Sequence, residues 1–196
     1  MSYNKEDLNF KFAYVKNYDV SEIKNIIETL EQEWKIDVSR QKTFKVHKHT
    51  ESYSINKVSL DWQPNTDLLA MPQTQTSELS ELALGIARDL EHKLDGKMGQ
   101  VLFIKLEAGK SIDKHIDGGE YLKCVARHHI PIITNLDVAF IIGGESKHLQ
   151  EGECWEISNI KEHAVINNGN ADRIHLLIDI IPNKFLPSKE GKNESN

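Results

Sequence analysis

The sequence predicts an α+β fold that is mainly β, in which helices from the N-terminal part pack outside a jelly-roll sandwich. Two observations lead to this expectation. The first half contains two stretches whose apolar residues recur with helical spacing, and the second half, from Gln100 onward, is a series of short strand-like runs broken by Gly and Asn. Short strands at this spacing favour an antiparallel sandwich or barrel over alternating β/α units.

Two helices are expected before the β-rich part. The first covers 20–37, with Ser21 as its N-cap and an apolar face of Ile23, Ile26, Ile27, Leu30 and Trp34. The second covers 77–94, and its apolar stripe consists of Leu79, Leu82, Ala83, Ile86, Leu90 and Leu94. Gly96 lies just beyond this stripe, so we expect it to end the second helix.

The strands are expected in two places. Residues 43–58 are rich in β-forming residues and predict one or two strands, and 61–76, with its two prolines, is expected to be loop. The later strands are predicted at 101–106, 121–133, 138–142, 153–158, 163–167 and 173–181. The last residues, 184–196, are charged and predict a flexible tail. We therefore expect one domain over 1–183, divided into 1–98 with helices and strands and 99–183 as the β core.

Composition excludes several classes of function. The chain of 196 residues has a formal net charge of −6, which does not favour nucleic acid as a partner. No apolar run is long enough to span a bilayer, and the polar N-terminus lacks the apolar core of a signal peptide. Cys124 and Cys154 are far apart and form no disulfide framework, so we expect a cytoplasmic protein with reduced thiols.

One pair of motifs predicts a metal site. His115 and Asp117 are two residues apart, so on a strand their side chains share a face, and His163 opens a β-rich run 48 residues later. Two histidines and one carboxylate on one side of an ion form the ligand set of non-haem Fe(II) oxygenases, which leaves positions open for other ligands. We therefore expect His115, Asp117 and His163 to be the metal ligands.

Basic residues beside these strands predict a site for a carboxylate. Asn167-Asn168-Gly169-Asn170 is typical of a hairpin turn, which would return Arg173 to the side of the His163 strand. A guanidinium there would hold a carboxylate with two parallel hydrogen bonds. Arg127 and His129 share a face of another predicted strand and are candidates for a second carboxylate.

The stretch 102–182 resembles the aspartyl/asparaginyl β-hydroxylase-like family of iron oxygenases, which includes bacterial proline hydroxylases. The resemblance rests on the order of Leu106-Glu-Ala-Gly, His115-Ile-Asp117, Arg127-x-His129-x-Pro131, Gly152-Glu-Cys-Trp, His163 and Arg173. It implies a double-stranded β-helix, a cupin-like form of the jelly roll. It also implies Fe(II) on His115, Asp117 and His163, and O2 and 2-oxoglutarate as cosubstrates. Arg173 would bind the distal carboxylate of 2-oxoglutarate, and Arg127 with His129 an inner carboxylate of cosubstrate or substrate.

Two departures from the family bear on the substrate. The peptidyl aspartyl hydroxylases of animals have a small residue where Asp117 stands, whereas the free-proline hydroxylases have the carboxylate. The chain also has extra residues, around 118–122, between the two motifs. The resemblance therefore implies hydroxylation of a carboxylate-bearing substrate, and ranks a free amino acid or small derivative above a peptidyl Asp, Asn or Pro side chain.

Other interpretations of the same residues remain open. A jelly roll of this kind also occurs as a non-catalytic, cupin-like protein that binds a metal or ligand, and as a metal-dependent isomerase or dioxygenase with three or four histidine ligands. His47 and His49 lie in a polar run and are expected at the surface. His175 shares the face of Arg173, and is expected either to line the pocket or to be a hydrogen-bonded core residue.

Overall fold

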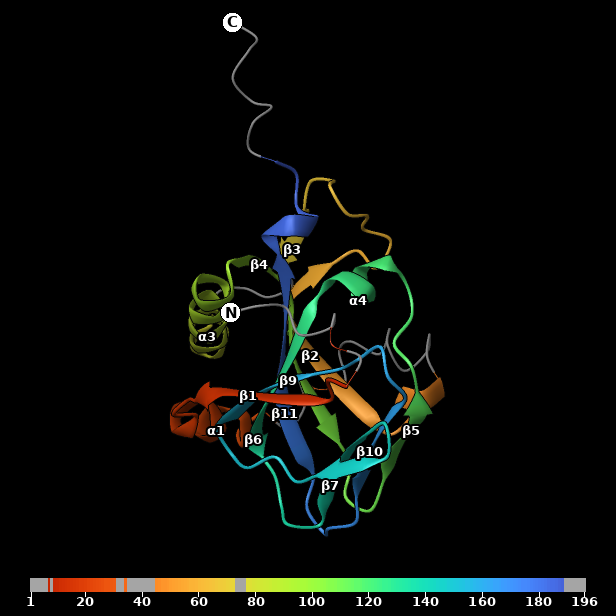
Figure 1. The fold of residues 1–196 in the computed structure, drawn as a ribbon. Helices are drawn as coiled ribbons and strands as arrows, with labels where there is room; N and C mark the ends of the chain where they lie inside the picture. The colour runs from red at the N-terminus through yellow and green to blue at the C-terminus, as the bar shows by residue number, and fades with distance from the viewer. Residues whose placement is uncertain (1–6, 8, 31–33, 35–44, 73–76, 189–196) are drawn as a thin grey trace, which may run out of the picture.

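Two antiparallel sheets face each other in the computed structural model, which describes residues 7, 9–30, 34, 45–72 and 77–188 (Figure 1). The larger sheet has the strand order β1 (Phe12–Asn17), β9 (Glu153–Ile157), β6 (Ala126–Ile133), β11 (Arg173–Pro182), β4 (Gly96–Leu106), β2 (Thr50–Val58) and β3 (Ala70–Pro72). The smaller sheet has the order β5 (Ser111–His115), β10 (His163–Asn167), β7 (Val138–Ile142) and β8 (Glu145–Lys147). The prediction of a mainly β jelly roll is confirmed.

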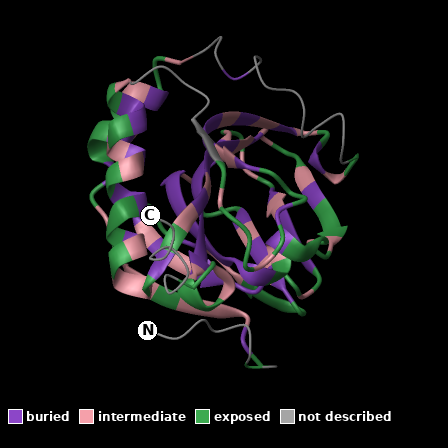
Figure 2. Ribbon diagram, turned by 90° about the horizontal axis from the view of Figure 1, so that it is seen from above, coloured by how far each residue is buried: buried purple, intermediate pink, exposed green. Residues whose placement is uncertain are grey.

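The helices lie outside this sandwich, as predicted. α1 (Ser21–Ile27) and α3 (Glu78–Leu94) bury apolar side chains against the outer face of the larger sheet, and this cluster includes Ile23, Leu90, Phe103 and Leu176. Figure 2 shows a long helix at the margin of the molecule, outside the ring of buried strands. Among the described residues, no helix has the length and apolar character needed to cross a membrane. Residues 31–33 and 35–37 of the first predicted helix lie outside the described residues.

Alternation along β11 separates two environments. Ile174, Leu176 and Ile178 belong to the apolar cluster beneath the helices. The intervening residues, such as Arg173 and Asp179, therefore point to the interior between the two sheets. Arg173 there contacts Phe140 of a second apolar cluster, which is formed by Leu106, Ile112, Val138, Phe140, Ile142, Leu149, Ile157 and Val165. Charged side chains in such an interior need partners, which points to a functional site.

Both helix ends differ from the prediction. Ser21 is the first residue of α1 rather than its cap, and its backbone N–H and hydroxyl donate to Asp19 Oδ1 at 3.0 and 2.6 Å. Asp95, with φ of 50°, is the left-handed residue that ends α3. Gly96 instead begins β4, where an added Cβ would lie 2.6 Å from the Ile181 carbonyl oxygen. Close approach to β11, not helix termination, explains this glycine.

The strand predictions were correct for β7 and β10 and differ from the structure in several other places. The first part of 121–133 is the short helix α4 (Glu120–Cys124), and β6 starts only at Ala126. The segment predicted as loop contains β3, and its residues 73–76 lie outside the described part. Three further strands, β1, β5 and β8, have no counterpart among the predicted runs. Phe185, expected in the tail, packs with Leu186 against a cluster around Trp62, and 189–196 are outside the described residues.

The N-terminal cap of α3 gives a stability test. The Ser77 hydroxyl accepts the Ser80 backbone N–H at 3.2 Å, which satisfies one of the free donors of the first turn. Ser77→Ala should lower the free energy of unfolding by about 1 kcal/mol in urea titration. Ser77→Asp, which restores an acceptor, should retain most of the parent stability. Equal stability of the alanine variant and the parent would show that this cap contributes nothing.

Candidate metal centre

Two histidines meet through the pairing of β5 with β10. His115 and His163 are register partners, and their ring centroids lie 4.2 Å apart. His115 Nδ1 lies 2.8 Å from the Asp113 carbonyl oxygen, and His163 Nδ1 lies 2.8 Å from the Lys161 carbonyl oxygen. Because a carbonyl only accepts, both Nδ1 atoms carry the proton and both Nε2 lone pairs are available to a metal.

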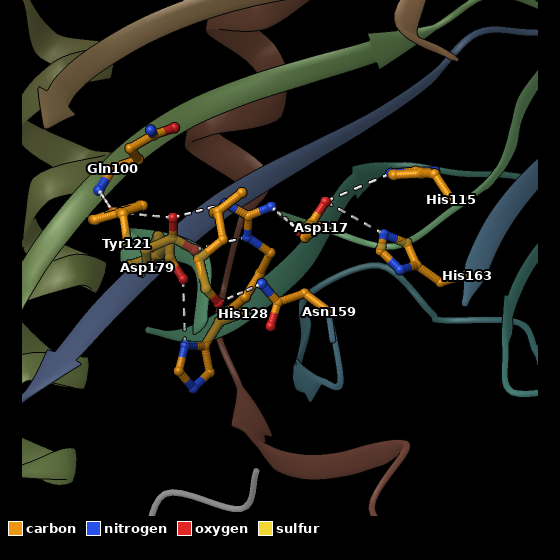
Figure 3. Close-up of polar contacts among 11 residues, drawn as sticks. Gln100, His115, Asp117, Tyr121, His128, Asn159, His163 and Asp179 are labelled. Carbon is orange, nitrogen blue, oxygen red and sulfur yellow. Dashed lines mark hydrogen bonds and ion pairs between the residues drawn. The ribbon is translucent and has the colours of Figure 1, made fainter. Parts of the chain in front are cut away.

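The carboxylate of Asp117 completes the group (Figure 3). Its Oδ1 lies 3.6 Å from His115 Nε2 and 3.8 Å from His163 Nε2. Metal–ligand bonds of about 2.1 Å allow two ligand atoms of one ion to be up to about 4.2 Å apart, so both separations fit a shared ion. Burial lowers the pKa of His163 below its ordinary value, which keeps this ring in the neutral form that binds metal.

The prediction that His115 and Asp117 share a strand is half right. β5 ends at His115, and Asp117 lies in the following loop, where its backbone N–H donates to the Asn159 carbonyl at 3.1 Å. The loop therefore directs the carboxylate toward the histidines by a bond to another segment rather than by strand alternation. In the part of the chain that the structure describes, this is the one group of three such residues with converging ligand atoms. Three protein ligands leave room for others on the same ion.

Arg127 lies beside this group but between two carboxylates of the chain. Its Nη1 donates to Asp117 Oδ2 at 2.6 Å, while its Nε and Nη2 donate to Asp179 Oδ1 and Oδ2 at 2.8 and 2.9 Å. Burial opposes the charge, but the two carboxylates outweigh it and raise the pKa of Arg127 above its ordinary value. The expected role on a carboxylate of cosubstrate or substrate therefore has to be weighed against partners within the chain.

Arg173 reaches the interior by a different route from the predicted hairpin. β10 and β11 belong to different sheets, so the turn after Asn167 crosses from one sheet to the other, and the hairpin prediction is wrong. The guanidinium spans the gap between the sheets and lies 5.9 Å from the centroid of Phe140, a register partner of Val165 on β10. Arg173 therefore still faces the sheet that carries His163, although it is not beside that strand.

Two histidines surround Arg173 in this interior. Arg173 Nη2 lies 2.6 Å from His175 Nδ1, and the His129 ring lies 5.7 Å from that of His175. Both members of the first pair are 1 % exposed. Burial, then the charge of Arg173, lowers the pKa of His175 well below its ordinary value, so the ring is neutral. Of the two expectations for His175, the hydrogen-bonded core residue agrees with this placement, because the ring is buried, contacts Arg173 and does not line the cavity beside the metal ligands.

His175 carries a polar atom that signals a ligand. An arginine can only donate, so His175 Nδ1 accepts and Nε2 carries the ring proton. This Nε2 is buried and has no hydrogen-bond partner among the described residues. A buried donor without an acceptor is costly, and an incoming carboxylate would supply the acceptor. The donor set therefore fits one end of a dicarboxylate.

A cavity of about 420 Å³ opens beside the metal ligands, and its wall includes His115, Asp117, Arg127 and a polar group from the larger sheet: Ser52, Ser54, Asn56 and Gln100. His47 also lines it, with its ring 5.6 Å from that of His115. The prediction of a surface position for His47 is therefore wrong. The segment Lys45–His47 is a 3₁₀ helix rather than a strand, and it folds this ring over the metal end of the barrel.

Two residues of the site, Asp179 and Tyr121, were not predicted from the sequence. Asp179 is fully buried and accepts the Tyr121 hydroxyl at 3.1 Å as well as Arg127. One signal was present, because a lone acid inside the apolar run of β11 needs a partner when the strand is buried on both faces. Tyr121 carried no such signal, since it lies in a segment predicted as strand.

Comparisons with known proteins agree with this geometry. A family model described as aspartyl/asparaginyl beta-hydroxylase matches residues 21–182. A 2OG-Fe(II) oxygenase family oxidoreductase from Burkholderia pseudomallei has a similar fold, with a TM-score of 0.60 and 12 % identity over 93 % of this chain and 91 % of that one. The non-heme monooxygenase ThoJ, solved as a nickel complex, also has a similar fold. Its TM-score is 0.54, with 12 % sequence identity over 88 % of this chain and 74 % of that one. No curated protein matches the chain in sequence.

Proposed function

Because the chain belongs to the aspartyl/asparaginyl β-hydroxylase family, we propose that it is an Fe(II)- and 2-oxoglutarate-dependent dioxygenase. It would hydroxylate an unactivated C–H bond of an amino acid, or of a peptidyl Asp, Asn or Pro side chain. One observation carries the proposal. His115, Asp117 and His163 direct their ligand atoms to one point and leave the rest of a coordination sphere to cosubstrate and oxygen.

The three ligands would hold iron, and the protein's share is to fix their orientation. Both histidines are set by hydrogen bonds from Nδ1 to backbone carbonyls, and such bonds determine the ring tautomer and direction. Bound iron supplies the redox chemistry that couples decarboxylation of the keto acid to succinate with insertion of one oxygen atom into the substrate. The chain's own residues then have to bind, orient and shield the reactants.

Arg173 is the proposed anchor for the distal carboxylate of 2-oxoglutarate. Its planar fork suits a carboxylate, and the neutral His175 holds one side of that fork while its own Nε2–H lacks an acceptor. His129, whose ring lies 5.1 Å from Phe140, stays a proposed contact to a carboxylate in the same interior. Fixing both ends of the keto acid would place its reacting end at the metal.

The cavity beside the ligands is the proposed substrate site. Its volume of about 420 Å³ suits an amino acid, a small derivative or the side chain of a peptide. The polar residues Ser52, Asn56 and Gln100 would bind the polar groups of the substrate, while Leu102 and Leu122 would contact its apolar part. Cys124 and Cys154 are buried thiols that form no disulfide with each other, which supports the cytoplasm as the proposed compartment.

Anaerobic titration of the protein with Fe(II) and 2-oxoglutarate tests this proposal without knowledge of the substrate. We expect a weak visible charge-transfer band, because absorbed light can move an electron from Fe(II) to the chelated keto acid. Zn(II) is the matched control, since it occupies similar sites but has no redox chemistry and should give no band. Addition of air should then release succinate, slowly without substrate.

Each other result of this titration has a definite meaning. Iron that binds without the band would show a metal site of another kind, and favour a non-catalytic cupin-like protein. Folded protein that binds no iron would overturn the assignment of His115, Asp117 and His163. Succinate release that a panel of amino acids and Asp-, Asn- or Pro-containing peptides accelerates would identify the class of substrate.

A further inference from the structure

The position of Arg127 suggests a role that differs from binding a cosubstrate. Its guanidinium is held on one side by both oxygens of Asp179 and on the other by a single oxygen of Asp117. Arg127 is 6 % exposed and Asp179 is not exposed. Two parallel hydrogen bonds from Nε and Nη2 to one carboxylate fix the orientation of the planar guanidinium. The remaining nitrogen, Nη1, therefore points toward Asp117.

Asp179 is itself held in place. Tyr121 donates its hydroxyl to Asp179 Oδ2 at 3.1 Å, and the same hydroxyl oxygen accepts the Gln100 backbone N–H at 2.8 Å. Gly99 leaves room for this arrangement, because a Cβ at that position would collide with the Tyr121 hydroxyl. Tyr121 comes from the short helix α4. A buried chain of contacts therefore runs from the backbone of β4 to Asp117 (Figure 3).

The two oxygens of Asp117 have separate partners at the end of this chain. Oδ2 accepts Arg127 Nη1, whereas Oδ1 faces the Nε2 atoms of both histidines. We propose that Arg127 is a positioning residue, anchored by Asp179 and Tyr121, which fixes the Asp117 carboxylate so that Oδ1 alone is presented to the metal. This proposal rests on the proposed metal site, but not on the reaction performed there.

Charge balance supports this role over carboxylate binding. Arg127 carries one positive charge between two carboxylates, and three of its five N–H groups are committed to them. A third carboxylate would meet a charge that is already compensated, so the attraction it gains is small. Arg173 lies elsewhere in the interior, against the neutral His175 and the Phe140 ring. In this proposal Arg127 orients the metal ligand Asp117, and Arg173 binds the cosubstrate.

Separate measurement of metal and cosubstrate affinity tests the role of Arg127. Zn(II), in competition with a chelator, is the probe, because its affinity for nitrogen ligands keeps weakened variants measurable. Arg127→Lys keeps a charge but cannot reach both carboxylates. It should weaken Zn(II) binding by about 10- to 100-fold, the usual effect of losing a group that orients a ligand. The affinity for 2-oxoglutarate at saturating metal should stay at the parent value. Unchanged Zn(II) affinity with weakened 2-oxoglutarate binding would overturn the proposal.

A second comparison separates positioning from a general effect on the fold. In the Asp117→Ala background the oriented carboxylate is absent, so Arg127→Lys should have no further effect on Zn(II) affinity. The same loss in both backgrounds would mean that Arg127 acts through the fold, and would overturn the role. A parent protein that binds no Zn(II) would overturn the metal site itself. A parent and an Arg127→Lys variant that bind Zn(II) equally well would overturn only the role of Arg127.

Tyr121→Phe provides the milder variant if Arg127→Lys does not fold. It keeps the Arg127–Asp179 pair and removes only the hydroxyl that supports Asp179. We expect a smaller loss of Zn(II) affinity that also disappears in the Asp117→Ala background. Parent-like affinity in Tyr121→Phe, with Asp117 present, would contradict the chain of contacts from α4 to the metal.

Discussion

His163→Ala is expected to abolish the binding of Fe(II) and with it the charge-transfer band. The residue is 6 % exposed, and its Nε2 is one of three atoms that converge on the metal position. The two remaining ligands, His115 and Asp117, cannot compensate. We therefore expect the affinity for Fe(II) to fall by more than about 100-fold, beyond the effect of losing a group that only orients a ligand. Anaerobic titration of the purified variant measures this loss.

His148→Ala is the matched control for this substitution. His148 also has its Nδ1 3.0 Å from a backbone carbonyl, that of Val138, but it does not belong to the group of converging ligand atoms. The control should bind Fe(II) as the parent does, and circular dichroism should show that both variants are folded. Stoichiometric iron in folded His163→Ala protein would show that this histidine is not a ligand.

Local patterns were sufficient to predict the elements that define the site. His163–Asn167 was placed at its observed bounds because a short β-rich run ends at an Asn-Gly turn. The two motifs His115-x-Asp117 and His163 were brought together correctly because the ligand chemistry requires them to meet. The metal ligands could therefore be predicted from residue spacing and residue chemistry, because both are visible within a few residues of each ligand.

Partners that depend on sheet topology could not be predicted in the same way. The turn after Asn167 has the residues of a hairpin, yet it joins two sheets, because β10 is already paired on both sides with β5 and β7. The pairing of Arg127 with Asp179 was not predicted, because no sequence pattern links Arg127 to a residue 52 positions later. His47 looked like a surface residue because its contact with His115 is made by distant segments.

Replacement of Arg173 is expected to weaken the binding of 2-oxoglutarate more than any other single substitution outside the metal ligands. Arg173→Met removes the charge and the fork but keeps the apolar stem beside Phe140. Loss of one partner from a buried, hydrogen-bonded charge pair typically costs about 2–5 kcal/mol. The dissociation constant of 2-oxoglutarate should therefore rise by about 30-fold to a few thousand-fold, at about 1.4 kcal/mol for each factor of ten. Fe(II) affinity, measured in the same anaerobic titration, should not change.

Two further variants show whether this effect belongs to the site. Arg173→Lys keeps the charge without the planar fork, so its affinity for 2-oxoglutarate should lie between those of the parent and Arg173→Met. Arg88→Ala removes a positive charge from the exposed face of α3, where Arg88 pairs with Glu81 at 3.5 Å, and should leave the affinity unchanged. If folded Arg173→Met binds 2-oxoglutarate as the parent does, the distal carboxylate lies elsewhere. The unsatisfied Nε2–H of His175 then requires a different acceptor, because its burial cost remains.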